Sequence, residues 1–328
     1  MSKHNYFSPI GEIQIDFDNE VINSVQFINE KKETYVKEPH ENNKAFVERI
    51  NRYFDQYFLS QNPTDSFEIK NTGNNFYKKV MEELRKVPLG NTIYYSELAE
   101  RIDHAKAARA VGKALGDNKI LIINPCHRVI AKNGIGGFRA DLWRKKYLLA
   151  LEQGKLSDMG LDSQQVKLSC NNHNWNELFQ IEKEAILSIL DISSDQIQHI
   201  GSTAVPGVCA KPIIDIMLGI KPEQETDILS ILNRIGWQYK ANFDPKEWHF
   251  LAKGVGDFYT HHLHVCHYKS NFYNNHVGFR EVMLKYPDEL KEYEKLKQRI
   301  SSNFAQNRQE YTKAKADFIV STIKKYGY

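Results

Sequence analysis

The sequence contains no apolar run that approaches the roughly 18 residues of a membrane helix, so we expect no membrane association. Its first residues lack the apolar core of a signal peptide, which predicts a cytoplasmic location. Only four cysteines occur in 328 residues, and no two form a CxxC pair. We therefore expect free thiols rather than a disulfide framework. Hydrophobic residues at 41% and charged residues at 26% exclude a collagen, a coiled coil or a disordered chain.

The basic residues are concentrated in one stretch of the chain. Residues 74–155 hold 16 Lys and Arg against 8 Asp and Glu, a net charge of +8, whereas residues 1–73 carry −4 and residues 156–328 carry −1. Such a block favours binding to a polyanion, most simply nucleic acid. The alternative is a solvated basic face with no ligand.

The length predicts about two domains. Alternation in Gly11–Asp18 and Val21–Ile28 predicts a hairpin, and apolar spacing predicts a helix over 42–59. The polar residues 155–166 lack periodicity and are interpreted as a linker. The expected organisation is a structural subdomain at 1–73, a second subdomain at 74–154, the linker at 155–166 and a C-terminal domain at 167–328.

Two short helices are predicted inside the basic block. Ser96–Ile102 and His104–Leu115 have the pattern of a helix-turn-helix, a shape that can present its second helix to DNA.

A cysteine lies at the end of an apolar run that follows these helices. Lys119–Ile123 predicts a strand, and this strand leads to Cys126 and His127. A thiolate is a nucleophile, and a histidine or a positive charge beside it raises its population. The alternative is a buried, inert cysteine.

The surrounding motifs carry a resemblance over residues 4–154. They are Val87-Pro88-x-Gly90, Tyr95-Ser96-x-Leu98-Ala99, Ala107-Ala108-Arg109-Ala110-Val111-Gly112, Asn118, Pro125-Cys126-His127-Arg128-Val129-Ile130, Gly134, Gly137 and Leu148-Leu149-x-x-Glu152. In this order and spacing the chain resembles the O6-alkylguanine-DNA alkyltransferases, also called methylated-DNA–protein-cysteine methyltransferases.

The resemblance implies a DNA repair reaction in which the protein is consumed. Cys126 would take the alkyl group from O6-alkylguanine in duplex DNA, with O4-alkylthymine as a further expected substrate. His127 would accept the thiol proton through a water, Glu152 would orient His127, and Asn118 would fix the active-site turn. Tyr95 would promote eversion of the base and donate a proton to it. No cofactor is implied, and a non-catalytic sensor of alkylated DNA is the alternative.

The same resemblance implies the DNA contacts. Arg109, on the second helix, would fill the space left by the everted base. The other expected contacts are Tyr95, Lys106, Ala108, Lys113 and Arg128, with Arg128 also supporting the active-site loop. On the rim of the expected pocket, Phe138-Arg139 and Ala140-Asp141 depart from the residues common in the family, which affects the size of alkyl group accepted.

Residues 167–328 resemble the GrpB family, a branch of the nucleotidyltransferase superfamily. The resemblance rests on Trp175-x-x-Leu178-Phe179, His199-Ile200-Gly201-Ser202-Thr203-Ala204-Val205-Pro206-Gly207, Ala210-Lys211-Pro212-Ile213-Ile214-Asp215-Ile216, Phe279-Arg280 and Tyr311-Thr312-x-Ala314-Lys315. It implies a nucleotidyltransferase-like α/β domain, so the expected fold class is a multi-domain α+β protein. The expected phosphate or nucleotide site consists of Gly201, Ser202, Lys211, Asp215, Arg280 and Lys315.

Metal chemistry in this domain depends on one strand. Two carboxylates at positions i and i+2 would share a strand face and hold Mg²⁺, but Asp215 is followed at that spacing by Met217, whose thioether is a poor Mg²⁺ ligand. Asp215 is therefore the one candidate ligand, and activity as a nucleotidyltransferase is a further alternative for the chain. His262, His264 and Cys266 alternate along another expected strand and permit a soft-metal site, with ordinary strand residues as the alternative.

Overall fold

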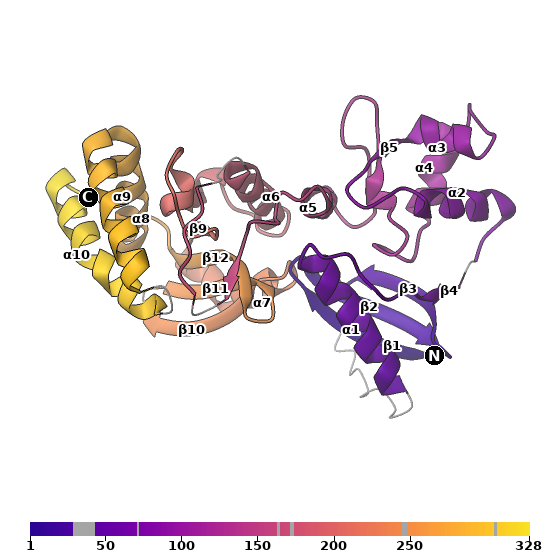
Figure 1. Cartoon of the computed structure of the whole chain (residues 1–328), viewed down its shortest axis with the longest axis horizontal. Coiled ribbons are helices and arrows are strands. Elements are labelled where there is room, and N and C mark those ends of the chain that lie inside the picture. The colour runs from indigo at the N-terminus through magenta and orange to yellow at the C-terminus, as the bar shows by residue number, and fades with distance from the viewer. Residues whose placement is uncertain (29–42, 71, 163–164, 171–173, 245–247, 305–306) are drawn as a thin grey trace. The chain divides into compact units, whose positions relative to one another are not determined.

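A computed structural model describes the chain except for residues 29–42, 71, 163–164, 171–173, 245–247 and 305–306 (Figure 1). The chain divides into two compact units, Met1–Ser157 and Asp158–Tyr328. Each unit combines helices with sheets, which confirms the expected mixed α+β class. Within the described residues, no helix is long and apolar enough to cross a membrane.

The first unit opens with a sheet in the order β1-β2-β3-β4. The strands are β1 (Ser2–Ser8), β2 (Gly11–Asp18), β3 (Val21–Phe27) and β4 (Glu68–Ile69). The expected hairpin is β2–β3, and its turn residues Asn19 and Glu20 both have positive φ. Helix α1 (Lys44–Phe58) packs on the sheet through aromatic side chains, with the ring of Phe46 5.0 Å from that of Phe17. The helix therefore has a fixed position on the sheet.

The rest of the first unit is mostly helical. It contains α2 (Asn75–Arg85), α3 (Tyr95–Arg101), α4 (Ala108–Gly116), α5 (Leu142–Glu152) and a parallel pair of short strands, β5 (Ile93–Tyr94) and β6 (Val129–Ile130). Val80 and Leu84 of α2, Leu98 of α3 and Val111 of α4 share one apolar core. The helix pair α3–α4 confirms the expected helix-turn-helix shape, although α4 begins four residues later than the pattern predicts.

The second unit is built on a mixed sheet in the order β10-β11-β12-β9-β8, with β7 paired to β12. Among the strand pairs of this sheet that the structure describes, β12 and β9 run parallel and the others are antiparallel. The strands are β7 (Leu161–Asp162), β8 (Ile197–Ile200), β9 (Ile214–Ile220), β10 (Gln238–Asp244), β11 (Trp248–Val255) and β12 (Phe258–His267). The helices are α6 (Trp175–Leu187), α7 (Glu225–Asn233), α8 (Asn271–Lys285), α9 (Pro287–Asn303) and α10 (Arg308–Tyr326).

The expected linker contains ordered structure. Leu161 and Asp162 form β7 and pair with Tyr259 and Phe258 of β12. Leu161 is 5% exposed, so it anchors this segment to the second unit. The sequence did not predict this strand, because the polar stretch around Leu161 is too short to show a periodic spacing of apolar residues. Within the expected linker at 155–166, the structure thus contains a short strand that pairs with the sheet of the second unit.

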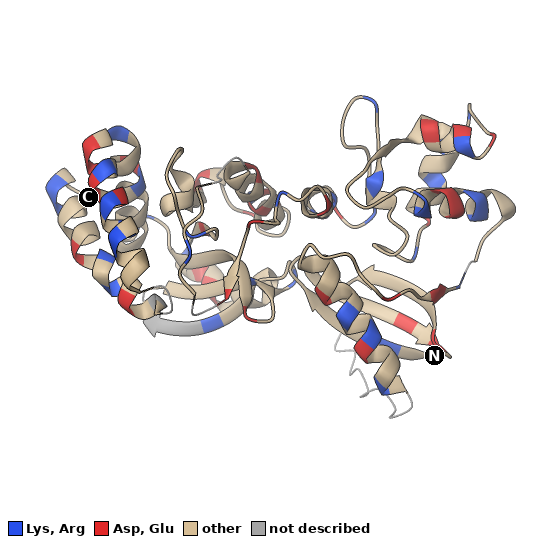
Figure 2. Ribbon diagram, in the orientation of Figure 1, with Lys and Arg blue, Asp and Glu red and all other residues tan. Residues whose placement is uncertain are grey.

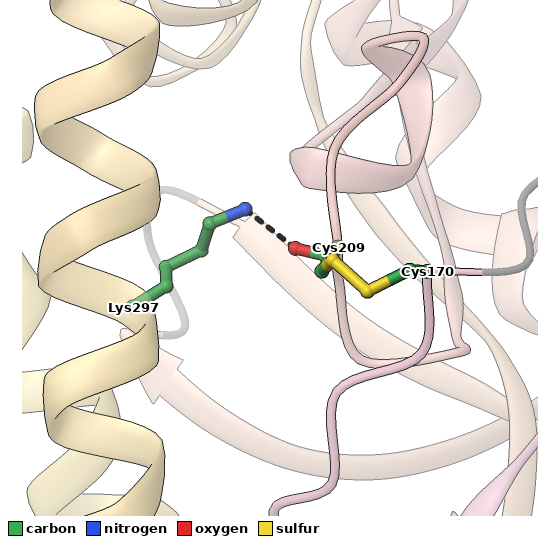
Figure 3. Close-up of a disulfide and its surroundings, with 3 residues drawn as sticks. All are labelled: Cys170, Cys209 and Lys297. Carbon is green, nitrogen blue, oxygen red and sulfur yellow. Dashed lines mark hydrogen bonds between the residues drawn. A yellow bond between two sulfur atoms is a disulfide. The ribbon is translucent and has the colours of Figure 1, made fainter.

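A disulfide joins Cys170 to Cys209 in the second unit (Figure 3). The neighbouring residues Ser169 and Ala210 form an antiparallel bridge and exchange both backbone hydrogen bonds, at 2.7 and 2.9 Å. This bridge brings the two cysteines directly opposite one another, with Cα atoms 4.1 Å apart. The expectation of free thiols holds for Cys126 and Cys266 and is wrong for this pair, because a separation of 39 residues leaves no sign of the contact in the sequence.

Candidate active site

A tight turn, rather than a strand, precedes the candidate nucleophile. Residues 119–123 were expected to form a strand, but the structure contains only isolated bridges there, one of them between Ile120 and Val25 of β3. Ile122 has a φ of 71°, a left-handed conformation that is costly for a β-branched residue. The chain thus turns sharply, and Cys126–Arg128 form a single 3-10 turn, η2. This turn buries the side chains of both Cys126 and His127, whereas a strand would have separated them.

Asn118 and Lys145 both act on the thiol of Cys126. Asn118 Nδ2 donates to Cys126 Sγ at 3.1 Å and to the carbonyl of Asn124 at 3.1 Å, so Asn118 links the nucleophile to its own turn. Burial raises the pKa of the Cys126 thiol, while the hydrogen bond from Asn118 and the positive charge of Lys145 act in the opposite direction. The thiolate is therefore the minor form at neutral pH, and reaction requires a group that removes the proton.

The carboxylate of Glu152 connects three side chains. Its Oε1 accepts hydrogen bonds from His127 Nε2 at 2.7 Å and from the Tyr57 hydroxyl at 2.7 Å. Arg128 donates to both carboxylate oxygens, from Nε at 2.7 Å and from Nη2 at 2.9 Å. Burial alone would raise the pKa of Glu152, but these partners hold it well below its usual value. Glu152 is thus a carboxylate at neutral pH.

His127 is arranged to accept a proton. Because Nε2 donates to Glu152, the neutral ring carries its proton there and presents an unprotonated Nδ1, an assignment that follows from the hydrogen bonds. Among the described residues, no group hydrogen-bonds to this buried Nδ1. Burial lowers the pKa of His127, so the ring is neutral at pH 7. His127 and Glu152 thus form a hydrogen-bonded pair, and His127 directly follows Cys126 in the chain.

A cavity of about 340 Å³ lies beside Cys126. Its other lining residues are Tyr95, Gly112, Leu115, Gly116, Gly137, Phe138 and Arg139. The ring of Tyr95 is held close to the backbone, because a Cβ atom on Gly136 would lie only 2.9 Å from Tyr95 Cε2. Of the rim residues singled out in the sequence, Phe138 and Arg139 line the cavity, whereas Asp141 pairs with Arg144 and Ala140 is buried.

Two buried residues at the site were missed by the sequence reasoning. Tyr57 was interpreted as a core residue of an apolar helix face, yet its hydroxyl contacts Glu152. Lys145 donates from Nζ to the carbonyls of Val129 at 2.6 Å and Gly137 at 3.0 Å, and it joins the turn before the cavity to the loop on its rim. Burial lowers the pKa of Lys145 to about 8. No local pattern marks either residue, because both contacts connect distant segments.

Helix α4 carries three of the expected DNA-contacting residues, namely Ala108, Arg109 and Lys113. Arg109 and Lys113 are exposed, Ala108 is half-buried, and Lys106 is exposed just before the helix. Figure 2 shows the Lys and Arg residues of α2 and α4 in this part of the first unit. Arg128 is different: only 9% of it is exposed, and its guanidinium binds Glu152 and the carbonyl of Val87 at 2.6 Å. Arg128 therefore supports the active-site turn, and its expected contact with DNA stays a prediction.

The second unit contains a cavity of about 410 Å³. Five of the six residues expected at a phosphate or nucleotide site line it, namely Gly201, Ser202, Lys211, Asp215 and Lys315. Gly201 has a φ of 69°, and a Cβ atom there would lie 2.8 Å from Asp215 Oδ2, so this position requires glycine. Arg280 lies outside the lining and donates to the side chain of Gln198 and the carbonyl of His199, both at 2.9 Å. The role expected for Arg280 in the phosphate or nucleotide site stays a prediction.

The donor groups described in this cavity do not form a three-ligand metal site. Among the described residues, no group of three His, Cys, Asp or Glu side chains could hold a metal. Asp215 is paired with His262 at 3.0 Å, and Met217 is fully buried in the core. Cys266 contacts Met217, with the two sulfur atoms 3.5 Å apart, while His262 and His264 line the cavity. The soft-metal site at His262, His264 and Cys266 is therefore not formed.

Comparison with known proteins matches the two halves of the chain separately. Residues 75–154 match the family model of the 6-O-methylguanine DNA methyltransferase DNA-binding domain, and residues 165–325 match that of the GrpB protein. Methylated-DNA--protein-cysteine methyltransferase of Methanosarcina acetivorans is 38% identical over 44% of this chain and 94% of its own length. Glutamate-rich protein GrpB of Alkalihalophilus pseudofirmus is 31% identical over 49% of this chain and 95% of its own length.

Solved structures also match each half. Mycobacterium tuberculosis OGT in complex with DNA is 31% identical over 47% of this chain and 94% of that chain, with a TM-score of 0.41. The conserved protein GrpB from Enterococcus faecalis is 27% identical over 49% of this chain and all of that chain, with a TM-score of 0.43. From the sequence relatives, the chain belongs to the methylated-DNA–protein-cysteine methyltransferase family in its N-terminal half and to the GrpB family in its C-terminal half.

Proposed function

We propose that the first unit repairs duplex DNA by moving the alkyl group of O6-alkylguanine, and of O4-alkylthymine, onto Cys126. The observation that carries this proposal is the position of Cys126: its thiol lines a cavity next to α4 and is followed directly by the His127–Glu152 pair. A sensor that only binds the lesion would not require a thiol nucleophile or the His127–Glu152 pair beside it in the chain. The proposed site of action is the cytoplasm.

The proposed reaction requires no cofactor. The proton of the Cys126 thiol passes through a water to Nδ1 of His127, whose positive charge Glu152 stabilises. The sulfur then attacks the alkyl carbon, an S–C bond forms, and the C–O6 bond breaks with its electron pair left on the base. The Tyr95 hydroxyl supplies a proton to the leaving base; burial raises its pKa, so the group is protonated at neutral pH. The thioether product offers no polar bond for hydrolysis, so each molecule reacts once.

The buried thiol also requires the damaged base to leave the helix. A sulfur inside a cavity of about 340 Å³ cannot reach a base within stacked DNA, so we propose that the nucleotide is everted into this cavity. Arg109 is exposed on α4, whose residues Gly112 and Gly116 line the same cavity, which supports its proposed role of filling the vacated stack.

Mass spectrometry tests the transfer directly. After incubation with a duplex that contains O6-methylguanine, the peptide with Cys126 should gain about 14 Da, because a methyl group replaces the thiol proton. The gain should stop at one methyl per protein molecule. Cys126→Ala should show no gain while it still binds the duplex. Methylation of the Cys266 peptide instead, or an unmodified protein with repaired DNA, would contradict the proposal.

Base eversion is tested at Arg109. We expect Arg109→Ala to slow repair of a base-paired O6-methylguanine roughly tenfold, since eversion costs a few kcal/mol and the variant loses the group that offsets it. Reaction with free O6-benzylguanine should change little, because no stack has to be opened. Lys132→Ala, at another exposed cation of the first unit, is the control for loss of charge. Equal losses on both substrates would reject the role of Arg109 in eversion.

A further inference from the structure

The helix on the N-terminal sheet reaches the candidate active site through one hydroxyl. Tyr57 is the last residue but one of α1, on the same buried face as Ile50 and Phe54. Its side chain is 3% exposed, and its ring lies edge-on to that of Phe58, with the ring centroids 5.3 Å apart. Packing of a helix, rather than a loop, therefore sets the position of the Tyr57 hydroxyl.

The Tyr57 hydroxyl donates its one proton to Glu152. The distance from Tyr57 Oη to Glu152 Oε1 is 2.7 Å, whereas Oη lies 3.5 Å from His127 Nε2. Because His127 Nε2 donates to the same Oε1 at 2.7 Å, the tyrosine and the histidine are neighbouring donors on one oxygen. Burial and the charge of Glu152 raise the pKa of Tyr57 well above its ordinary value, so the hydroxyl remains a donor at neutral pH.

The orientation of the Glu152 carboxylate is already set by Arg128. The guanidinium donates to Oε1 from Nη2 at 2.9 Å and to Oε2 from Nε at 2.7 Å, and such a bidentate pair fixes the plane of the carboxylate. The distinct effect of the Tyr57 hydroxyl is therefore on charge. It shares the negative charge of Oε1 with His127, which binds the same oxygen.

The charge on Oε1 controls how readily His127 accepts a proton. A carboxylate stabilises a protonated imidazole beside it, and a further hydrogen bond to the carboxylate weakens this effect because part of its charge is already compensated. Burial lowers the pKa of His127, Glu152 raises it, and the positive charges of Arg128 and Lys145 lower it further. The hydrogen bond from Tyr57 acts in the same direction as these positive charges. The titratable or charged groups around His127 come from three elements, namely Glu152 and Lys145 of α5, Arg128 and Cys126 of η2, and Tyr57 of α1.

We propose that Tyr57 is a positioning residue for alkyl transfer that acts through Glu152. By sharing the charge of Oε1, its hydroxyl keeps His127 unprotonated and able to accept the thiol proton of Cys126. The inference rests on the proposed repair reaction. It gives the N-terminal subdomain at 1–73 a part in that reaction beyond support of the fold.

The pH dependence of alkyl transfer tests this role. The single-turnover rate is measured as methylated Cys126, with the full chain saturated by a duplex that contains O6-methylguanine. In the wild-type chain the rate should fall in acid as His127 becomes protonated. In Tyr57→Phe we expect the midpoint of this fall to lie about half a pH unit higher, a roughly threefold loss of rate in the acid range, because His127 then faces a less compensated carboxylate. At about pH 8 the ring is unprotonated in both proteins, so the two rates should agree within about twofold.

Tyr6→Phe is the matched control. The Tyr6 hydroxyl donates to Asp55 Oδ1 at 2.8 Å, so this variant also loses a hydrogen bond between a tyrosine and a carboxylate in the N-terminal subdomain, but not one to Glu152. Its midpoint should equal that of the wild-type chain. Replacing Tyr57 with 3-fluorotyrosine retains the ring and makes the hydroxyl a stronger donor, so the midpoint should then move to lower pH.

Three outcomes would overturn the inference. These are an unchanged midpoint in Tyr57→Phe, an equal shift in Tyr6→Phe, and an equal loss of rate at every pH, which is the result of a purely structural contact. If Tyr57→Phe does not fold, the 3-fluorotyrosine protein decides, and an unchanged or higher midpoint would reject the role. A wild-type chain that leaves the duplex unrepaired would reject the repair reaction instead. NMR titration of the His127 ring would then still test the tyrosine, because the pKa of His127 should be higher in Tyr57→Phe.

Discussion

Replacing Glu152 with glutamine is expected to lower the free energy of unfolding of the first unit by about 3 kcal/mol. The change is nearly isosteric, but it leaves the guanidinium of Arg128 buried without its carboxylate. His127 also loses the charge that stabilises its protonated form. We expect alkyl transfer to slow at least a hundredfold, the lower range for loss of general-base catalysis.

Urea denaturation and single-turnover repair assays check both parts of this prediction. Glu82→Gln is the matched control, since Glu82 is exposed on α2 and should change stability by less than about 0.5 kcal/mol. Wild-type rates of transfer in Glu152→Gln would remove Glu152 from the mechanism. Wild-type stability would show that the ion pair with Arg128 contributes no net free energy.

The same groups predict how stability depends on pH. The pKa of His127 is lowered by burial, so the unfolded chain binds more protons than the folded unit as the pH falls below the ordinary value of 6.5. The pKa of Glu152 is also lowered in the folded unit, so its contribution is present above the ordinary value of 4.5 and is lost as the pH falls further. Both effects reduce stability in acid. The Glu152→Gln variant should retain the loss of stability near pH 6 and show a smaller loss than the wild-type chain below pH 4.5.

The family resemblance of the sequence singled out Asn118, His127 and Glu152, but two other buried groups of the site were not predicted. Tyr57 lies 95 residues from Glu152, on a helix whose apolar spacing explains its burial without any polar role. Lys145 lies on a helix whose other buried residues are mostly apolar, and its contacts are carbonyls that no pattern can specify. Long-range contacts of single side chains require the fold.

In the second unit the sequence predicted the positions of strands along the chain more reliably than the directions of single side chains. The spacing of apolar residues predicted the strands that became β9 and β12, but not that they would pair in parallel. Arg280 follows Phe279 on one helix, yet only Phe279 faces the cavity. Side-chain direction on a helix changes by about 100° per residue, so a motif locates a residue but not the surface that it serves.

A second large effect on stability is expected from a buried ion pair in the second unit. Glu182 of α6 accepts a hydrogen bond from Lys253 of β11 at 2.6 Å, and both side chains are fully buried. Glu182→Gln should lower the free energy of unfolding of this unit by about 3–5 kcal/mol, because it leaves the ammonium of Lys253 without its counter-charge. Glu184→Gln, at an exposed position of the same helix, should cost less than about 0.5 kcal/mol.

The double variant Glu182→Leu/Lys253→Met separates the pair from its parts. Burial raises the pKa of Glu182 against the effect of Lys253, so removing the carboxylate from water is not fully offset by the pair. Trp237 lies against Lys253, with its ring 4.8 Å from Nζ, and would provide an apolar surface for methionine. We therefore expect the double variant to be within about 1 kcal/mol of the wild-type chain in urea denaturation, although each single change is costly. A double variant as unstable as Glu182→Gln would show instead that the pair itself contributes several kcal/mol.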